Sequence, residues 1–132
     1  MDLNASNVAS KRLKTFSFSR WGASDTDFSG LKLTNAAGEE SMLIGTERHA
    51  WESVTLQDQP IKKITMFEKN CNYMKGFRIQ YRNGQTDIIN ADSGTEVGSI
   101  EFEPFDELIG MTVQSASDRK PRKFGFTIMR NG

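Results

Sequence analysis

The chain has 132 residues, of which 36% are hydrophobic, and its 17 Lys and Arg residues balance 17 Asp and Glu. This length fits one domain with a single hydrophobic core. The composition is too apolar for a disordered chain and too polar for a membrane protein, and the balanced charge argues against a nucleic-acid partner.

Targeting signals are absent from the sequence as it stands. The first residues carry neither a basic stretch nor an apolar run, and no window approaches the length of apolar sequence that a membrane-spanning helix needs. The single cysteine, Cys71, has no partner for an internal disulfide. We therefore expect a cytoplasmic protein without a membrane span.

Apolar and polar residues alternate in short segments along the chain, which predicts β-strands and little or no helix. Phe77, Ile79 and Tyr81, for example, alternate with polar residues. Asn83-Gly84 predicts a hairpin with a type I′ turn, since both residues tolerate positive φ. In chain order, the predicted strands cover residues 13–19, 30–34, 41–45, 50–56, 61–67, 75–82, 86–91, 96–103, 107–114 and 123–130.

The pattern repeats along the chain. Adding 47 to the residue numbers carries the apolar positions of 61–66 and 77–81 onto apolar positions of 108–113 and 124–128, and Thr65 onto Thr112. Subtracting 48 carries the start of the same segment onto residues 13–18. Such self-similarity is typical of a fold built from copies of one supersecondary unit.

Three units are predicted, at about 13–56, 61–103 and 107–132, within one domain that spans 1–132. A lone four-stranded sheet leaves its apolar face exposed, so each unit needs the other two. The expected fold is all-β, a β-prism of three four-stranded antiparallel sheets with pseudo-threefold symmetry. The third unit is short, and we expect an N-terminal strand near 4–10 to complete its sheet.

Three segments resemble the jacalin-related lectins. Residues 76–84 (GFRIQYRNG) are similar to that family's G-[IL]-x-[VI]-x-Y-x-x-G strand and turn. Residues 99–111 and 123–128 are similar to its I-x-L-x-x-x-E-x-I-x-x-V segment and its closing strand. The resemblance implies the β-prism fold and carbohydrate binding.

In that family, loops at one end of the prism bind the sugar, and a Gly-x-x-x-Asp loop before the last strand supplies a carboxylate. Here Arg122 stands at the position of that Asp and Asp118 at that of the Gly, so the motif is absent. The loop at 20–27 instead carries an aromatic ring, a glycine and two carboxylates. The predicted sugar-binding residues are Trp21, Gly22, Asp25, Asp27, Asp118, Arg119, Arg122 and Lys123.

Charge is unevenly distributed despite the overall balance. Seven acidic residues and no basic one lie between Gln85 and Glu107, whereas four basic residues and one acidic residue lie between Ser117 and Lys123. A compact basic loop can bind a sulfated or otherwise acidic glycan, or an acidic protein surface. The alternative is an ordinary solvated loop.

Catalytic and metal-binding patterns are not found. His49, the single histidine, has no nucleophile or carboxylate at a recognisable spacing, and no cluster of metal-ligating residues or phosphate-binding loop occurs. We expect no cofactor and no enzymatic activity. The first hypothesis is a carbohydrate-binding module, with a homodimer as a reasonable assembly. The alternative is a structural or protein-interaction domain that keeps the prism and has lost the sugar site.

Overall fold

The computed structural model describes residues 11–22, 28–41, 43–69, 73–90, 94–115 and 121–129. Ten strands and no helix are assigned in these ranges, as predicted. No helix in this part of the chain is long and apolar enough to cross a membrane. The strands are β1 (Leu13–Arg20), β2 (Phe28–Asn35), β3 (Ile44–Gly45), β4 (Glu52–Thr55), β5 (Ile61–Lys69), β6 (Tyr73–Tyr81), β7 (Thr86–Ile89), β8 (Thr95–Glu101), β9 (Glu107–Ser115) and β10 (Pro121–Met129).

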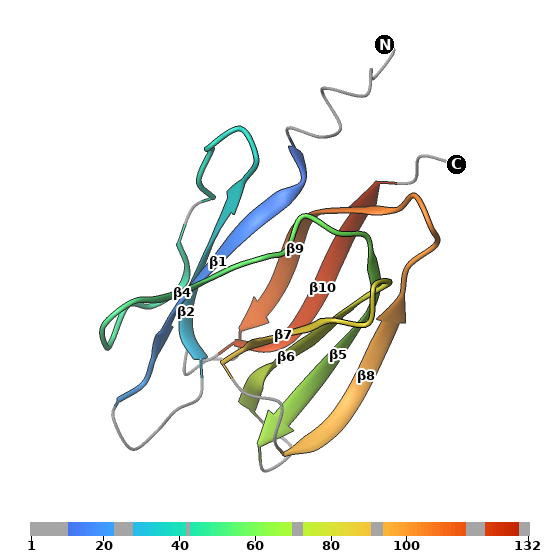
Figure 1. Ribbon diagram of the computed structural model, residues 1–132. Helices are drawn as coiled ribbons and strands as arrows, with labels where there is room; N and C mark the ends of the chain where they lie inside the picture. The colour runs from blue at the N-terminus through green and yellow to red at the C-terminus, as the bar shows by residue number, and fades with distance from the viewer. Residues whose placement is uncertain are drawn as a thin grey trace.

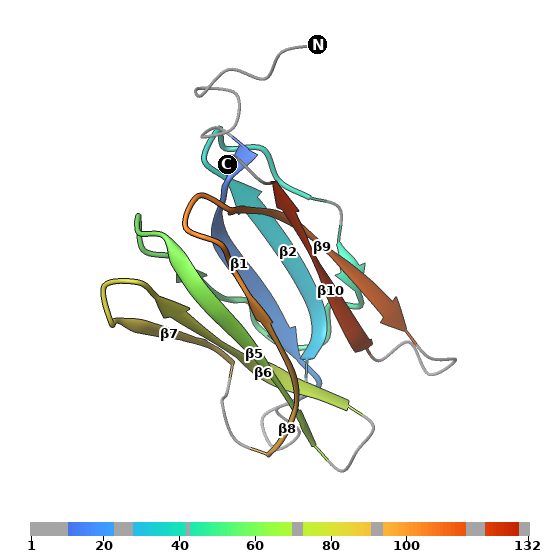
Figure 2. The same ribbon diagram turned by 90° about the vertical axis from the view of Figure 1, so that its right-hand side faces the viewer.

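The strands form three antiparallel sheets that face a common interior (Figures 1 and 2). The first has the order β3-β2-β1-β4, and the second repeats that order as β7-β6-β5-β8. The third contains β10 and β9. Contacts between β2, β6 and β10 bring the sheets together, so each covers the apolar face of the others.

The strand pairing confirms the sequence repeat at the level of individual hydrogen-bonded ladders. Phe16 pairs with Leu33 in the first sheet, and the residues at matching positions pair in the other two (Ile64 with Ile79, and Met111 with Phe126). The register also shifts at matching places in all three units, between 13 and 15, between 61 and 63, and between 108 and 110. A β-bulge is a specific local feature, so its threefold recurrence is strong evidence for copied units.

One predicted strand is shorter in the structure, and another lies outside the described residues. The strand expected at 41–45 is reduced to Ile44–Gly45, with an isolated bridge between Thr34 and Glu40. The third sheet, expected to have four strands, has two among the described residues, and the strand predicted near 4–10 lies outside them. Between that bridge and β3, the Ser41 hydroxyl accepts a hydrogen bond from the Leu33 amide, and the Ser41 amide donates to the Leu33 carbonyl.

The hairpin turn after β6 was predicted correctly in place but not in type. The Gly84 amide donates to the Tyr81 carbonyl, the Tyr81 amide donates to the Gln85 carbonyl, and Gly84 has φ of 90°. Asn83 has no positive φ, so this is a three-residue loop closed by a glycine bulge, not a type I′ turn. The hairpin after β2 repeats it, with Gly38 at φ of 85°.

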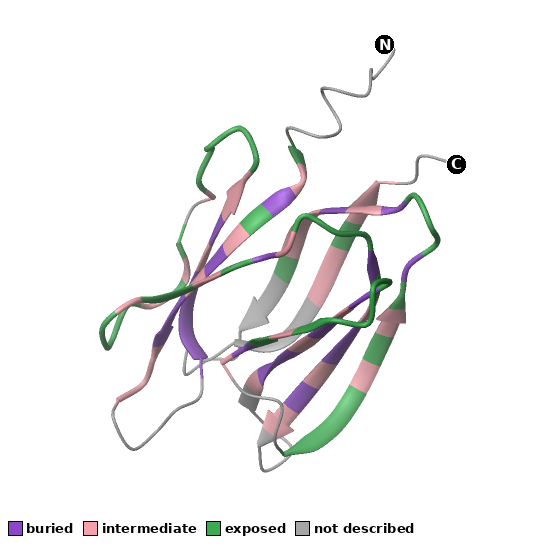
Figure 3. Ribbon diagram, in the orientation of Figure 1, coloured by how far each residue is buried: buried purple, intermediate pink, exposed green. Residues whose placement is uncertain are grey.

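Aromatic rings fill the interior between the sheets. The Phe77 ring lies 5.5 Å from that of Phe28 and 5.6 Å from that of Phe126, centroid to centroid, and it also contacts Phe16. These four rings come from all three sheets. Figure 3 shows buried residues alternating with more exposed ones along β5 and β6, as the period of two requires. Each buried Phe or Leu contributes about 1.5–3 kcal/mol relative to its exposed state.

A buried tyrosine attaches the link between the first two units to the second sheet. The Tyr81 hydroxyl donates to Asp87 Oδ2 at 2.6 Å and accepts from the Gln57 amide at 3.1 Å. Burial, together with the hydrogen bond to Asp87, raises the pKa of Tyr81 well above its usual value. The hydroxyl therefore stays protonated and serves as a structural link.

An arginine between two carboxylates joins the first and third units. Arg12 contacts Asp58 at 2.5 Å and Glu107 at 3.1 Å. Burial raises the pKa of Glu107, and the charge of Arg12 offsets only part of that effect. This cluster lies where β1 and β9 begin.

Candidate functional site

Strands β1, β5 and β9 finish at the same end of the molecule, and β10 starts there (Figures 1 and 2). Trp21 and Gly22 directly follow β1 at this end. We define the loop end as residues 19–22, 46–49, 52, 75 and 90 together with the first residues of β10.

The structure places half of the predicted sugar-binding residues. Trp21 is half-buried, and a Cβ added at Gly22 would meet no described atom within 4 Å apart from those of its chain neighbours. Arg122 and Lys123 lie near the start of β10, with Arg122 as the extra backbone residue of a bulge. Both pairs therefore belong to the loop end. The remaining four, Asp25, Asp27, Asp118 and Arg119, lie outside the described residues.

A buried serine holds the connection between β3 and β4 against the end of β1. Ser19 is 0% exposed, and its Oγ accepts from the Arg48 amide at 3.1 Å and the His49 amide at 2.9 Å. The same hydroxyl donates to the His49 carbonyl at 2.8 Å. The Thr46 amide adds a hydrogen bond to the Ser29 carbonyl at 2.8 Å. The backbone at 46–49 is thereby fixed to both β1 and β2.

The head group of Arg48 lies over the ring of Trp21. The centre of its guanidinium group lies 4.3 Å from the centroid of the Trp21 ring, within the range of a cation–π interaction. Because Ser19 fixes the backbone and the ring fixes the head group, both ends of the exposed Arg48 side chain are positioned. The result is an aromatic ring with a cation over it at the loop end.

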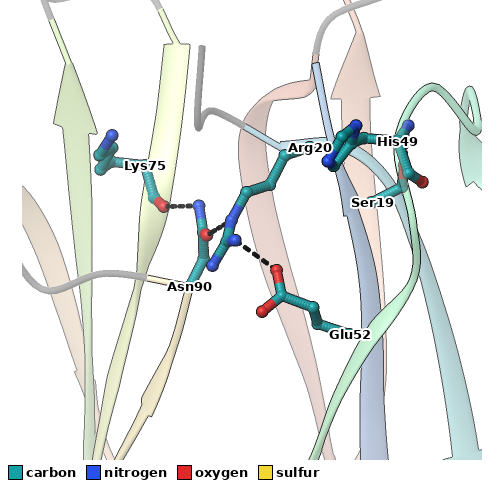
Figure 4. Close-up of polar contacts among 6 residues, drawn as sticks. All are labelled: Ser19, Arg20, His49, Glu52, Lys75 and Asn90. Atoms are coloured by element: carbon teal, nitrogen blue, oxygen red, sulfur yellow. Dashed lines mark hydrogen bonds and ion pairs between the residues drawn. The ribbon is translucent and has the colours of Figure 1, made fainter. Parts of the chain in front are cut away.

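A second arginine links the first sheet to the second (Figure 4). Arg20 Nε donates to Asn90 Oδ1 at 2.6 Å, and its Nη1 forms an ion pair with Glu52. Asn90 in turn donates to the Lys75 carbonyl at 2.7 Å and has a positive φ of 67°. Since these contacts occupy the Arg20 head group, this network supports the shape of the loop end.

Ser19 and His49 are neighbours but cannot act as a nucleophile and base. The Ser19 hydroxyl is buried and bonds only to the backbone of residues 48 and 49. A catalytic pair needs an accessible hydroxyl bonded to the imidazole. In the part of the chain that the structure describes, no group of three His, Cys, Asp or Glu residues is arranged to hold a metal.

Hollows in the surface lie away from the loop end. One of about 430 Å³ is lined by Arg12, Leu13 and Asp58 among others, where β1 begins. Another, of about 340 Å³, lies between β2, β3 and β9 and includes Leu33 and Met111. Neither hollow is lined by a residue of the loop end.

Sequence reasoning missed Ser19, Arg20, Arg48 and Asn90. The sequence offered one usable signal, that the connection after β3 must return to the end of the sheet where β1 finishes. That signal places residues 46–51 beside Trp21, although it does not identify Arg48 as the residue that stacks on the ring.

Comparisons with known proteins find similarity in structure alone. No protein-family model matches the sequence, and no curated protein sequence is significantly similar. A prostate-specific WGA16 glycoprotein lectin is similar to the chain with a TM-score of 0.71 at 11% identity, over 89% of this chain and 82% of the lectin.

Two further solved structures are similar. Calystegia sepium agglutinin gives a TM-score of 0.66 at 13% identity, over 91% of this chain and 83% of the agglutinin. Calsepa lectin, solved in complex with a biantennary N-glycan, gives 0.64 at 15% identity, over 91% and 84%. The chain therefore has the β-prism fold of the jacalin-related lectins that its sequence resembles.

Proposed function

We propose that the protein is a non-enzymatic carbohydrate-binding module that binds glycans through the loop end. The observation that carries this proposal is the Trp21 ring at the end of β1, beside an exposed and positioned Arg48. Aromatic faces stack on the apolar faces of sugar rings, and charged groups form hydrogen bonds with sugar hydroxyls that are stronger than neutral ones. The lectin neighbours, one of them solved with an N-glycan, support glycans as the ligand class.

A prism that has lost its sugar site is the second candidate, with a structural or protein-interaction role. The replacement of the expected Asp by Arg122 favours it, because the carboxylate that accepts sugar hydroxyls is then missing. The occupied Arg20 head group favours it as well. For either function, we propose that the protein is cytoplasmic and forms a homodimer.

A glycan array with matched tryptophan variants tests the first candidate. The chain has two tryptophans, and each carries a cation over its ring, Arg48 over Trp21 and Lys32 over Trp51. Trp21→Ala should remove glycan binding, and Trp51→Ala should retain it. Variants Asp25→Ala, Asp27→Ala and Asp118→Ala test the predicted carboxylates on the same array. If the wild type binds none of the neutral, acidic and sulfated glycans on the array, the second candidate is favoured.

Fluorescence gives the same test in solution. Trp51→Phe leaves Trp21 as the single tryptophan, so any emission change on titration with a glycan reports on the loop end. If the glycan binds elsewhere, the emission of this variant stays constant while binding is still detected by calorimetry.

A further inference from the structure

We propose that Arg48 is an anion subsite, and that the preferred glycans carry sulfate or carboxylate groups. This inference rests on the proposed carbohydrate binding at the loop end and narrows its ligand class. Arg48 lies in the connection between β3 and β4, a segment that the sequence patterns did not single out for binding.

The first support is the positioning of Arg48. Its amide is bound to the buried Ser19 hydroxyl at 3.1 Å, and its guanidinium group lies over the Trp21 ring at 4.3 Å. A flexible side chain loses rotamer freedom when it binds a ligand. Much of that loss has already occurred in the free protein, because both ends of the side chain are held.

The second support is the shape of the guanidinium group. Its N–H donors lie in one plane and form a fixed fork. Those donors match the spacing of two oxygens of a sulfate or carboxylate, which Arg binds in a bidentate manner. Lysine lacks this planar fork, so the choice of residue matters.

The third support is that no carboxylate among the described residues pairs with Arg48. Arg12, Arg20 and Lys32 each form an ion pair with a carboxylate. Arg48 forms none with any residue in the described ranges, including its chain neighbour Glu47. Within this part of the chain no carboxylate neutralises its charge, and the proposal assigns that role to the anion of the ligand.

The surroundings favour a sugar as the carrier of the anion. Gly22, the residue after Trp21, has room for an added Cβ. The proposal places a pyranose ring beside the indole, with its acidic substituent on Arg48. An acidic protein segment would need a wider complementary surface than one ring and one guanidinium group.

The test measures binding of four probes at fixed ionic strength: a sulfated oligosaccharide, the same oligosaccharide after chemical desulfation, sodium sulfate alone, and poly-glutamate. The wild type should bind the sulfated form at least about 10-fold more tightly than the desulfated form, since hydrogen bonds to charged groups are worth roughly 1.5–3 kcal/mol. Binding should weaken as salt rises, because exposed charges are screened.

Substitutions test whether Arg48 is the residue that binds the anionic group. Arg48→Ala should lose most of the preference for sulfate, and Arg48→Lys should keep part of it because the charge remains without the fork. Lys32→Ala is the matched control, since Lys32 also lies over a tryptophan ring, and it should bind as the wild type does. Thermal unfolding confirms that each variant is folded.

Several outcomes would overturn the inference. Equal binding of sulfated and desulfated forms, or an unchanged Arg48→Ala, rejects the anion subsite and leaves carbohydrate binding in place. Sodium sulfate that displaces the oligosaccharide at millimolar concentration indicates a simple anion site. If the protein binds poly-glutamate but none of the sugars, carbohydrate binding itself is rejected and a protein-interaction role is favoured.

Discussion

Substituting Ser19 by alanine tests whether one buried hydroxyl organises the loop end. The Ser19 Oγ makes three hydrogen bonds to the backbone of Arg48 and His49, at 2.8, 2.9 and 3.1 Å, and is fully buried. In Ser19→Ala, two amides and one carbonyl lose that partner. Leaving buried polar groups unpaired costs about 1–3 kcal/mol.

The exposed position of residues 48 and 49 lets water replace some of these bonds. We therefore expect a loss of about 2 kcal/mol in the free energy of unfolding. With about 2.1 cal/mol/K of unfolding entropy per residue over 132 residues, each kcal/mol lowers Tm by roughly 4 °C. Ser19→Ala should unfold about 7 °C below the wild type.

Ser17→Ala is the control on the same strand. Ser17 Oγ lies 2.9 Å from Ser53 Oγ in an exposed hydrogen bond, so its loss should change stability by less than about 0.5 kcal/mol. Urea titration followed by circular dichroism measures both variants. If Ser19→Ala and Ser17→Ala unfold at the same urea concentration, the connection at 46–49 does not depend on Ser19. Weaker binding of acidic glycans by Ser19→Ala would extend the argument to Arg48.

Three further predictions concern ionisation and backbone geometry. Because the pKa of Tyr81 is raised, its contribution to stability is complete below pH about 10 and is lost as the pH rises further. The variant Tyr73→Phe leaves Tyr81 as the one tyrosine, and its absorbance titration should give a midpoint above 10. The pKa of Glu107 is raised, so its charged form destabilises the folded protein at neutral pH. Glu107→Gln should therefore be at least as stable as the wild type at pH 7, and the difference should vanish as the pH falls toward 4. Denaturant titrations at both pH values measure this, and a variant less stable at pH 7 would mean that the Arg12 ion pair dominates. Asn90 has φ of 67° and binds Arg20. Asn90→Gly should lower the free energy of unfolding by about 1 kcal/mol for the lost hydrogen bonds, and Asn90→Ala by about 1 kcal/mol more, because alanine is strained in the left-handed region. Equal stability of the two variants would contradict this.

The sequence was sufficient to predict the strands because their residues alternate with a strict period of two. Phe77, Ile79 and Tyr81 have one possible orientation relative to a core, and a shift of one residue would expose all three. The copied pattern predicted three units for the same reason, since each copy repeats the apolar positions that need covering. The bulges that recur near residues 14, 62 and 109 confirm that register in the structure.

The turn after β6 marks the limit of local reasoning. Asn83-Gly84 permits two hairpin geometries, and the pairing of Tyr81 with Gln85 selects the three-residue loop. That pairing depends on the register of the whole sheet. The local residues therefore fixed where the turn lies, and the sheet determined its type.

The arrangement of the loop end was decided by tertiary structure. Arg20 and Asn90 are 70 positions apart, and Arg48 reaches Trp21 from a different strand connection. Nothing in the local sequence distinguishes Arg48 from other exposed arginines, because a side chain acquires its role from neighbours that only packed sheets bring together. Periodicity determines which face of a strand is buried, whereas contacts between strand ends depend on how three separate sheets meet.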